Sequence, residues 1–221
     1  DGGLPPDSVV QPIDAILADS RRAVERWHDP RPGSMRQVAL APCSPFSVTG
    51  DLLRESAKLA RSLGVRLHTH VAETRDEERY TLERYGMRPL AYMESLGWTG
   101  PGVSSGVCRV PEMLELGVPL GLAVDGSASN DGSSLLEELR VCYLLHRLQD
   151  SRTAPTGYDL LKVATRGSAR LLGRTDIGHL APGMRADLFL IRLNRLELVG
   201  ADLDPRSMLA TVGFRGPVDC T

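Results

Sequence analysis

Short apolar segments alternate with helical patterns along most of this chain, and this order limits the folds that it can adopt. Apolar runs of strand length lie at residues 38–41, 65–71, 118–124 and 186–193. Helical patterns lie at residues 14–27, 51–63, 76–85, 89–96, 111–116, 135–148 and 158–172. Strands separated by helices of this size favour βαβ units, and therefore a parallel sheet or a βα barrel.

The composition is that of a globular protein. Of 221 residues, 42% are apolar and 24% are charged, which is enough for one large domain or two small ones with a real core. The formal net charge of -2 provides no positive field for nucleic acid or an anionic membrane. No apolar run reaches 18 residues. We therefore expect neither nucleic acid nor a membrane as a partner.

Four widely spaced cysteines form no CxxC pair, so a disulfide framework or a structural zinc knuckle is not expected. A reduced, cytoplasmic setting follows from this usage. Cys43 could be a nucleophile, but the sequence offers no dedicated base for it, and the prediction is a small apolar filler.

Two histidines alternate at the end of the apolar run 65–71, and a carboxylate follows. In a strand, residues i and i+2 share a face, so His68 and His70 are predicted to point the same way. Imidazoles aimed together from a strand end suit a divalent metal. Glu73, just past the strand, is placed to move a proton beside that metal. Alone, however, such a pair is more often a buried structural feature.

A second polar strand end follows residues 118–124. In a βα barrel the chemistry lies at the C-terminal ends of the strands, where Asp125 would join His70 and Glu73. Histidine and carboxylates there can hold a metal that lowers the pKa of a water molecule to about 7. The alternatives are a simple turn at Asp125 and an anion-binding helix start over residues 127–134, which lacks the lysine of a P-loop.

The remaining titratable groups are predicted to be structural. The acidic run at residues 76–78 is typical of a solvated helix face. His28 and His179 lie in turn-like segments, and His146 is expected on a polar helix face, so none of the three is predicted to bind metal.

Taken together, these motifs resemble the amidohydrolase superfamily. The pattern is His70-x-x-Glu73 followed by Asp125-Gly-Ser-Ala-Ser-Asn-Asp131, and it is similar to the aminohydrolase branch of deaminases and s-triazine hydrolases. Residues 2–7, 41–45 and 125–131 look most like 8-oxoguanine deaminases. Residues 165–169 and 180–187 are similar to the usual C-terminal part.

The resemblance implies a fold and a set of roles. The fold is a distorted (β/α)8 TIM barrel over residues 1–176, with the C-terminal barrel helix and the start of a flanking β-domain over residues 177–221. His70 and Asp125 would be metal ligands, with Asp125 also the general base. Glu73 would be the proton shuttle, and His68 a neighbour that packs or orients.

The resemblance also implies the ligands of the site. The metal would be one divalent ion, zinc by resemblance or iron as the alternative. Asn130 and Asp131 would contact a small heterocyclic substrate. A homo-oligomer is expected.

Parts of the family pattern are missing from this chain. The first histidine pair of the family would lie upstream of Asp1, and about two βα units, one bearing a further histidine ligand, are absent near Val103. Because deleting two barrel strands would expose unpaired edges, we expect that the sequence omits stretches of a longer chain.

The leading expectation is therefore an enzyme, a metal-dependent deaminase of an oxidised purine such as 8-oxoguanine. Alternatives are a hydroxy-s-triazine N-alkylaminohydrolase, another guanine, pterin or cytosine deaminase, and a barrel remnant without catalysis.

Overall fold

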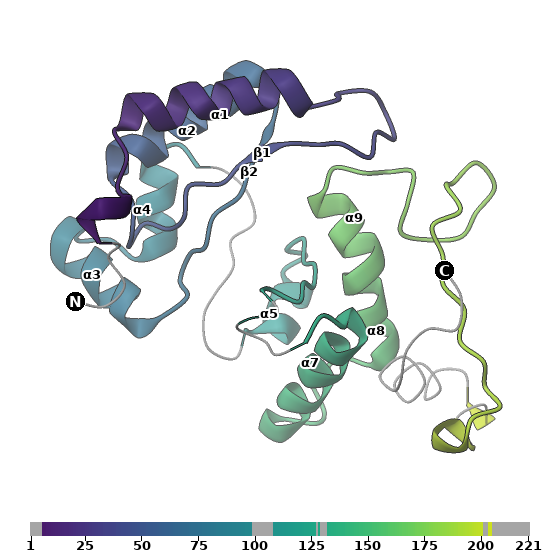
Figure 1. The fold of residues 1–221 in the computed structure, drawn as a ribbon. Helices are drawn as coiled ribbons and strands as arrows, with labels where there is room; N and C mark the ends of the chain where they lie inside the picture. The colour runs from purple at the N-terminus through teal and green to yellow at the C-terminus, as the bar shows by residue number, and fades with distance from the viewer. Residues whose placement is uncertain (1–5, 99–107, 127, 129–131, 201–202, 205–221) are drawn as a thin grey trace. The chain divides into compact units, whose positions relative to one another are not determined.

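A computed structural model of the chain describes residues 6–98, 108–126, 128, 132–200 and 203–204 (Figure 1). The chain forms two compact units, residues 1–108 and residues 109–221. The boundary between the two units, after Cys108, lies close to the junction that the sequence predicts near Val103. Among the described residues, no helix combines the length and the apolar character needed to cross a membrane.

The first unit begins with a helical layer against a short parallel sheet. A 3-10 turn, η1 (Asp7–Val9), precedes α1 (Ile13–Trp27), and α1 packs on α2 (Gly50–Leu63) (Figure 1). The strands β1 (Ala39–Leu40) and β2 (Arg66–Leu67) pair in parallel, with Leu40 opposite Leu67. Their apolar side chains join those of both helices in one core cluster, which contains Val24, Leu40, Leu59 and Ala60. The sheet is therefore fixed by its helical cover.

The ends of α2 are set by local chemistry that the sequence predicts. Thr49 is the N-cap, and its side chain accepts a hydrogen bond from the amide of Leu52. Gly64 closes the helix in the left-handed conformation, with φ of 66°, which costs glycine little. The chain can thus turn directly from α2 into β2.

Two further helices complete the first unit. The helices α3 (Arg75–Tyr85) and α4 (Pro89–Ser95) contact each other. Their core cluster contains Leu53 of α2, Val71 after β2, and Tyr92, Met93 and Leu96. The indole of Trp98 donates to the carbonyl oxygen of Leu53 at 3.0 Å. This cluster holds Val71, and with it the chain that follows β2.

The second unit is helical among its described residues. It contains α5 (Val110–Glu115), α7 (Leu135–Gln149) and α8 (Gly157–Lys162). The π-helical turn η2 (Val163–Gly167) leads into α9 (Ser168–Leu171), and a 3-10 turn, η3 (Leu196–Leu198), follows. The single helix predicted over residues 158–172 is therefore interrupted by a π-helical turn, a feature often found near functional sites.

Two predicted strands are not formed among the described residues. Residues 118–124 are without strand assignment, and in residues 186–193 only Leu190 is in a bridge. A strand requires a partner for its backbone hydrogen bonds, and an apolar run alone does not supply one.

Residues 120–122 instead pack directly on the π-helical turn. The Ser168 hydroxyl accepts from the amide of Leu122 at 3.3 Å and donates to the carbonyl oxygen of Val163 at 3.4 Å. Gly167 makes this approach possible, because a Cβ there would lie 1.9 Å from the carbonyl oxygen of Leu120. The residues leading to Asp125 are thereby held against the helix.

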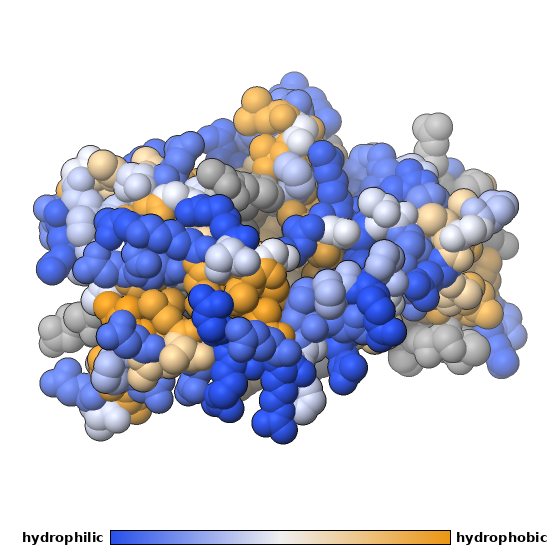
Figure 2. Space-filling model, turned by 90° about the horizontal axis from the view of Figure 1, so that it is seen from above, coloured by the Kyte–Doolittle hydropathy of each residue, from blue (hydrophilic) through white to orange (hydrophobic). Residues whose placement is uncertain are grey.

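Apolar side chains also reach the surface. On α7, the large apolar residues that are more than a third exposed are Leu135, Val141, Leu144, Leu145 and Leu148. In the view of Figure 2, apolar side chains lie among hydrophilic ones over much of the surface. The described residues thus leave one side of α7 uncovered.

We predict that Gly167→Ala lowers the free energy of unfolding by about 3 kcal/mol, because its methyl group would overlap the Leu120 carbonyl oxygen. Urea unfolding of the full-length protein measures this. The matched control is Gly64→Ala, where no atom lies within 4 Å of the added methyl and only the cost of the left-handed backbone, about 1 kcal/mol, remains. Equal losses in the two variants would contradict the close approach.

His146 departs from its prediction. It is 4% exposed instead of lying on a polar helix face, and it shares one side of α7 with buried Leu139, seven residues earlier. Among the described residues, neither of its ring nitrogens has a hydrogen-bond partner. Burial lowers the pKa of His146, against a smaller opposing effect of Glu112.

This burial predicts a pH dependence of stability. Since the folded pKa of His146 lies below its unfolded value of about 6.5, the unfolded state binds more protons as the pH falls through that value. The free energy of unfolding should therefore drop between pH 8 and pH 5.5 in wild type more than in His146→Leu. Urea titrations at both pH values test this, with His179→Gln, an exposed site, as the control. Parallel pH curves for wild type and His146→Leu would refute it.

Candidate active site

Two backbone hydrogen bonds tie the segment after β2 to the end of β1 and the residues beyond it. The amide of His68 donates to the carbonyl oxygen of Leu40 at 2.9 Å, and the amide of His70 donates to that of Cys43 at 2.9 Å. The two imidazoles are edge to face, with ring centroids 5.7 Å apart. The two rings are thus in contact, but the predicted strand over residues 65–71 is formed only at Arg66–Leu67, so both histidines lie beyond its end.

The same carbonyl group also orients the ring of His70. Its Nδ1 lies 3.0 Å from the carbonyl oxygen of Cys43. Because a carbonyl oxygen can only accept, Nδ1 carries the hydrogen, and Nε2 of the neutral ring is left with its lone pair. Metal-binding histidines are commonly held in this way. His70 is also exposed, so Nε2 can be reached from outside.

Cys43 contributes its backbone to this arrangement. The Thr69 hydroxyl donates to the same carbonyl oxygen at 3.0 Å. The prediction of a buried filler is wrong, since Cys43 is exposed and its thiol is free. The next two residues, Ser44 and Pro45, are buried, so the chain stays in the interior here while the Cys43 side chain reaches the surface.

Glu73 follows in a tight turn. Ala72 has φ of 56°, a left-handed conformation that non-glycine residues rarely adopt, and the chain bends there between Val71 and Glu73. Val71 is buried and Glu73 is exposed. Thr74 then caps α3, and its hydroxyl accepts from the amide of Glu77 at 3.2 Å.

The structure reveals a site residue that the sequence analysis missed. Glu77 was expected on a solvated helix face, and that expectation is wrong because its side chain is 2% exposed. Its carboxylate accepts from the amides of Ala72 and Glu73, at 2.9 and 2.8 Å. The signal available in the sequence was the spacing Thr74-x-x-Glu77, which is typical of a capping box.

Asp125 is in the second unit. It is exposed and left-handed, with φ of 59°, and it ends the segment that packs on the π-helical turn. Asn130 and Asp131 lie outside the described residues. In the described part of the chain, no three His, Cys, Asp or Glu side chains form a group that could hold a metal ion. The structure thus joins His68 to His70, and the grouping of His70 with Asp125 remains a proposal.

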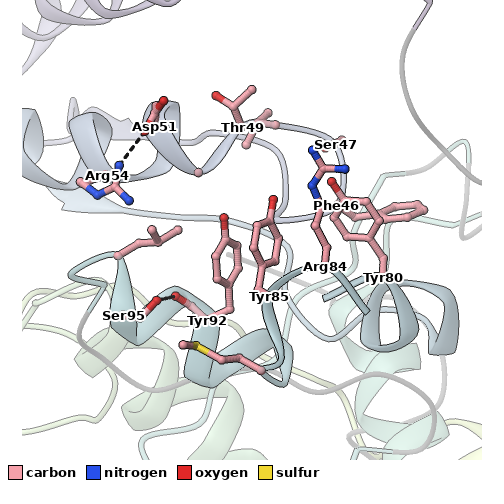
Figure 3. A pocket seen from close by; sticks show the side chains of 14 residues that line it. Phe46, Ser47, Thr49, Asp51, Arg54, Tyr80, Arg84, Tyr85, Tyr92 and Ser95 are labelled. Carbon is pink, nitrogen blue, oxygen red and sulfur yellow. Dashed lines mark hydrogen bonds and ion pairs between the residues drawn. The ribbon is translucent and has the colours of Figure 1, made fainter. Parts of the chain in front are cut away.

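The first unit contains a cavity of about 590 Å³ (Figure 3), and neither His70 nor Glu73 is among the residues that line it. The Tyr85 and Tyr92 rings stack 3.9 Å apart beside it, and Asp51 pairs with Arg54 at 2.6 Å. Burial, with a further effect of Tyr85, raises the pKa of Tyr92. The polar groups that line the cavity thus contact one another. The segment that carries His70 is therefore the better candidate site.

The chain belongs to the Amidohydrolase family. The sequence model of this family matches residues 3–103 and 101–221, which together span nearly all of the chain. The two matches meet where the sequence predicts a junction.

Two bacterial proteins are similar in sequence to nearly all of this chain. The chain is 45% identical to 8-oxoguanine deaminase of Pseudomonas aeruginosa, over 95% of this chain and 54% of that protein. It is 41% identical to hydroxydechloroatrazine ethylaminohydrolase of Pseudomonas sp. strain ADP, over 100% of this chain and 53% of that protein. The chain therefore spans about half the length of these relatives.

Solved structures agree on the fold. The chain matches the atrazine chlorohydrolase of Arthrobacter aurescens TC1, solved in complex with zinc, with a TM-score of 0.88 at 30% identity. The match covers 98% of this chain and 55% of that one. The predicted class, an α/β barrel of the metal-dependent hydrolase type, is confirmed, and this chain carries part of it.

We predict that His70→Ala, in the full-length protein, weakens zinc binding more than ~100-fold, because loss of even an outer-shell partner costs about 10–100-fold. His68→Ala is the control, and it should keep the wild-type metal content. Metal analysis of the dialysed proteins by mass spectrometry measures both. Equal metal loss in the two variants would contradict the assignment of His70 as the ligand.

Proposed function

We propose that this chain is part of a metal-dependent deaminase that hydrolyses the amino group of an oxidised purine, with 8-oxoguanine the leading substrate, and releases ammonia. The observation that carries the proposal is the geometry of His70, whose Nδ1 hydrogen is held by the Cys43 carbonyl at 3.0 Å, which leaves Nε2 to bind a metal. Glu73 lies three residues further along the chain. The 45% identity to 8-oxoguanine deaminase supports the choice of substrate.

The residues present fit a divalent metal. His70 supplies an imidazole ring whose Nδ1 is held by the Cys43 carbonyl, and Asp125 is an exposed carboxylate after an apolar segment. His70 and Asp125 would hold the ion together with ligands from outside this chain. Nitrogen and oxygen ligands suit zinc, which the related chlorohydrolase contains, and iron is the alternative. When bound, the metal supplies a water molecule of lowered pKa as the nucleophile.

The chain's own residues then move protons. Asp125 would accept the proton of the attacking water, because a carboxylate can act as a general base. Glu73 would donate a proton to the ring nitrogen beside the carbon under attack, which lowers the barrier to addition. When the tetrahedral carbon collapses, Asp125 would return its proton to the amino group, which leaves as ammonia, and the hydroxyl group on that carbon would give its proton to Glu73 as the carbonyl forms. Asn130 and Asp131 would contact the substrate ring.

A second candidate activity is the removal of an alkylamine from a hydroxy-s-triazine. The 41% identity to hydroxydechloroatrazine ethylaminohydrolase favours this reaction over the deamination of a pterin or of cytosine. The two leading reactions differ in the leaving amine and share the same proton transfers. Assays of the full-length protein with 8-oxoguanine and with N-ethyl hydroxytriazine distinguish ammonia from ethylamine as the product.

A third candidate is a barrel remnant without catalysis. The mass of the purified protein tests it, because 24.0 kDa corresponds to these 221 residues, whereas a deaminase of its relatives' size would have about twice that mass. The homo-oligomer, the cytoplasmic location and the domain boundary at residue 176 also stay predictions.

We predict that Glu73→Gln retains the metal and lowers kcat by about 10²–10⁴-fold, because the amide cannot deliver the proton. Ammonia release and metal content, measured on the same preparation, test this. The control is Glu83→Gln, an exposed residue of α3. Near-normal turnover of Glu73→Gln would remove Glu73 from the mechanism.

A further inference from the structure

Glu77 makes hydrogen bonds that differ from those of an ordinary helix cap. In a capping box, the carboxylate at the third helical position accepts from the amide of the N-cap residue. Here Thr74 is the N-cap, and Glu77 reaches past it to the two amides before it. Oε1 accepts from Ala72 at 2.9 Å and Oε2 accepts from Glu73 at 2.8 Å. Each carboxylate oxygen therefore binds a different residue of the turn.

The left-handed conformation of Ala72 makes this possible. Two successive amides point to the same anion when neighbouring residues adopt conformations of opposite hand, which forms a small anion-binding nest. With φ of 56°, Ala72 carries a steric cost of about 1–2 kcal/mol that glycine would avoid. Such a conformation persists only where its surroundings hold it. The buried carboxylate of Glu77 provides that restraint.

The turn is thus held at both ends. Val71, 8% exposed, is anchored in the cluster with Leu53 and Met93, and the amide of Glu73 is anchored by Glu77. Between these anchors lies the single residue Ala72. The direction in which the Glu73 side chain leaves the backbone, relative to His70 in the segment after β2, is therefore set by this turn.

We propose that Glu77 is the positioning residue of the active site, a buried carboxylate that holds the Ala72–Glu73 turn and so aims the Glu73 carboxyl group at the substrate. This rests on the proposed role of Glu73 in proton transfer. Glu77 itself stays away from the substrate, because its carboxylate is buried and engaged by two backbone amides.

The test is Glu77→Gln in the full-length metal-loaded protein. Glutamine keeps the volume but offers an NH₂ group to one of the two amide donors, so that one hydrogen bond is lost. Because a displacement of about 1 Å can cost about 100-fold in rate, we expect kcat to fall about 10–100-fold, with KM and metal content close to wild type. The control is Glu78→Gln, whose carboxylate bonds Arg88 at 2.8 Å on the outer side of α3 and whose kcat should change less than about twofold.

A second substitution separates positioning from general damage. Since glycine adopts φ of 56° without steric cost, Ala72→Gly added to Glu77→Gln should recover kcat about fivefold over Glu77→Gln alone. Amide hydrogen exchange at residues 72 and 73 should speed up in Glu77→Gln in either case, because it reports the lost hydrogen bonds and not the activity.

The outcomes are distinct. Faster exchange at residues 72 and 73 with unchanged kcat would overturn the positioning role, and so would a parallel loss of kcat and metal. If Glu77→Gln folds poorly, Glu77→Asp replaces it in the test. This variant keeps the charge but is one methylene shorter, and we again expect kcat to fall while KM stays close to wild type. Near-normal turnover of Glu73→Gln would instead remove Glu73 from the proposed mechanism and leave the turn geometry intact.

Discussion

The carbonyl group of Cys43 is the contact on which the site depends. It accepts the amide of His70, beyond the end of β2, and it lies 3.0 Å from Nδ1 of the same residue. One backbone oxygen thus holds both the backbone and the ring of His70. That oxygen is in turn positioned by β1, which α2 holds in place through their shared core cluster.

The chain after His70 is constrained in the same manner, by groups that are themselves buried. Val71 enters a core cluster, and Glu77 binds the next two amides. The exposed residues His70 and Glu73 carry the proposed chemistry, whereas the residues between and behind them supply the geometry. This division is common in enzymes, where a rigid scaffold aims a few accessible groups.

The family and the local elements could be predicted from sequence because each rests on short-range patterns. The bounds of α1 and α2 follow from apolar periodicity, from the Thr49 cap and from Gly64. The strands at residues 118–124 and 186–193 were predicted from apolar runs and are not formed among the described residues, because pairing requires a neighbour that periodicity cannot supply. His146 and Cys43 were misplaced for the same reason, since burial depends on what packs against a residue.

By itself, the sequence showed the resemblance to amidohydrolases and placed His70 near the end of a strand with Glu73 shortly after it, although β2 ends earlier than predicted, at Leu67. Only the tertiary structure decided which nitrogen of His70 is free, because the group that fixes it lies 27 residues earlier in the chain. It also decided that Glu77 is buried and bound to the turn, while the adjacent Asp76 is exposed. The sequence shows which residues are charged, but the groups with which they interact depend on distances that only the folded structure sets.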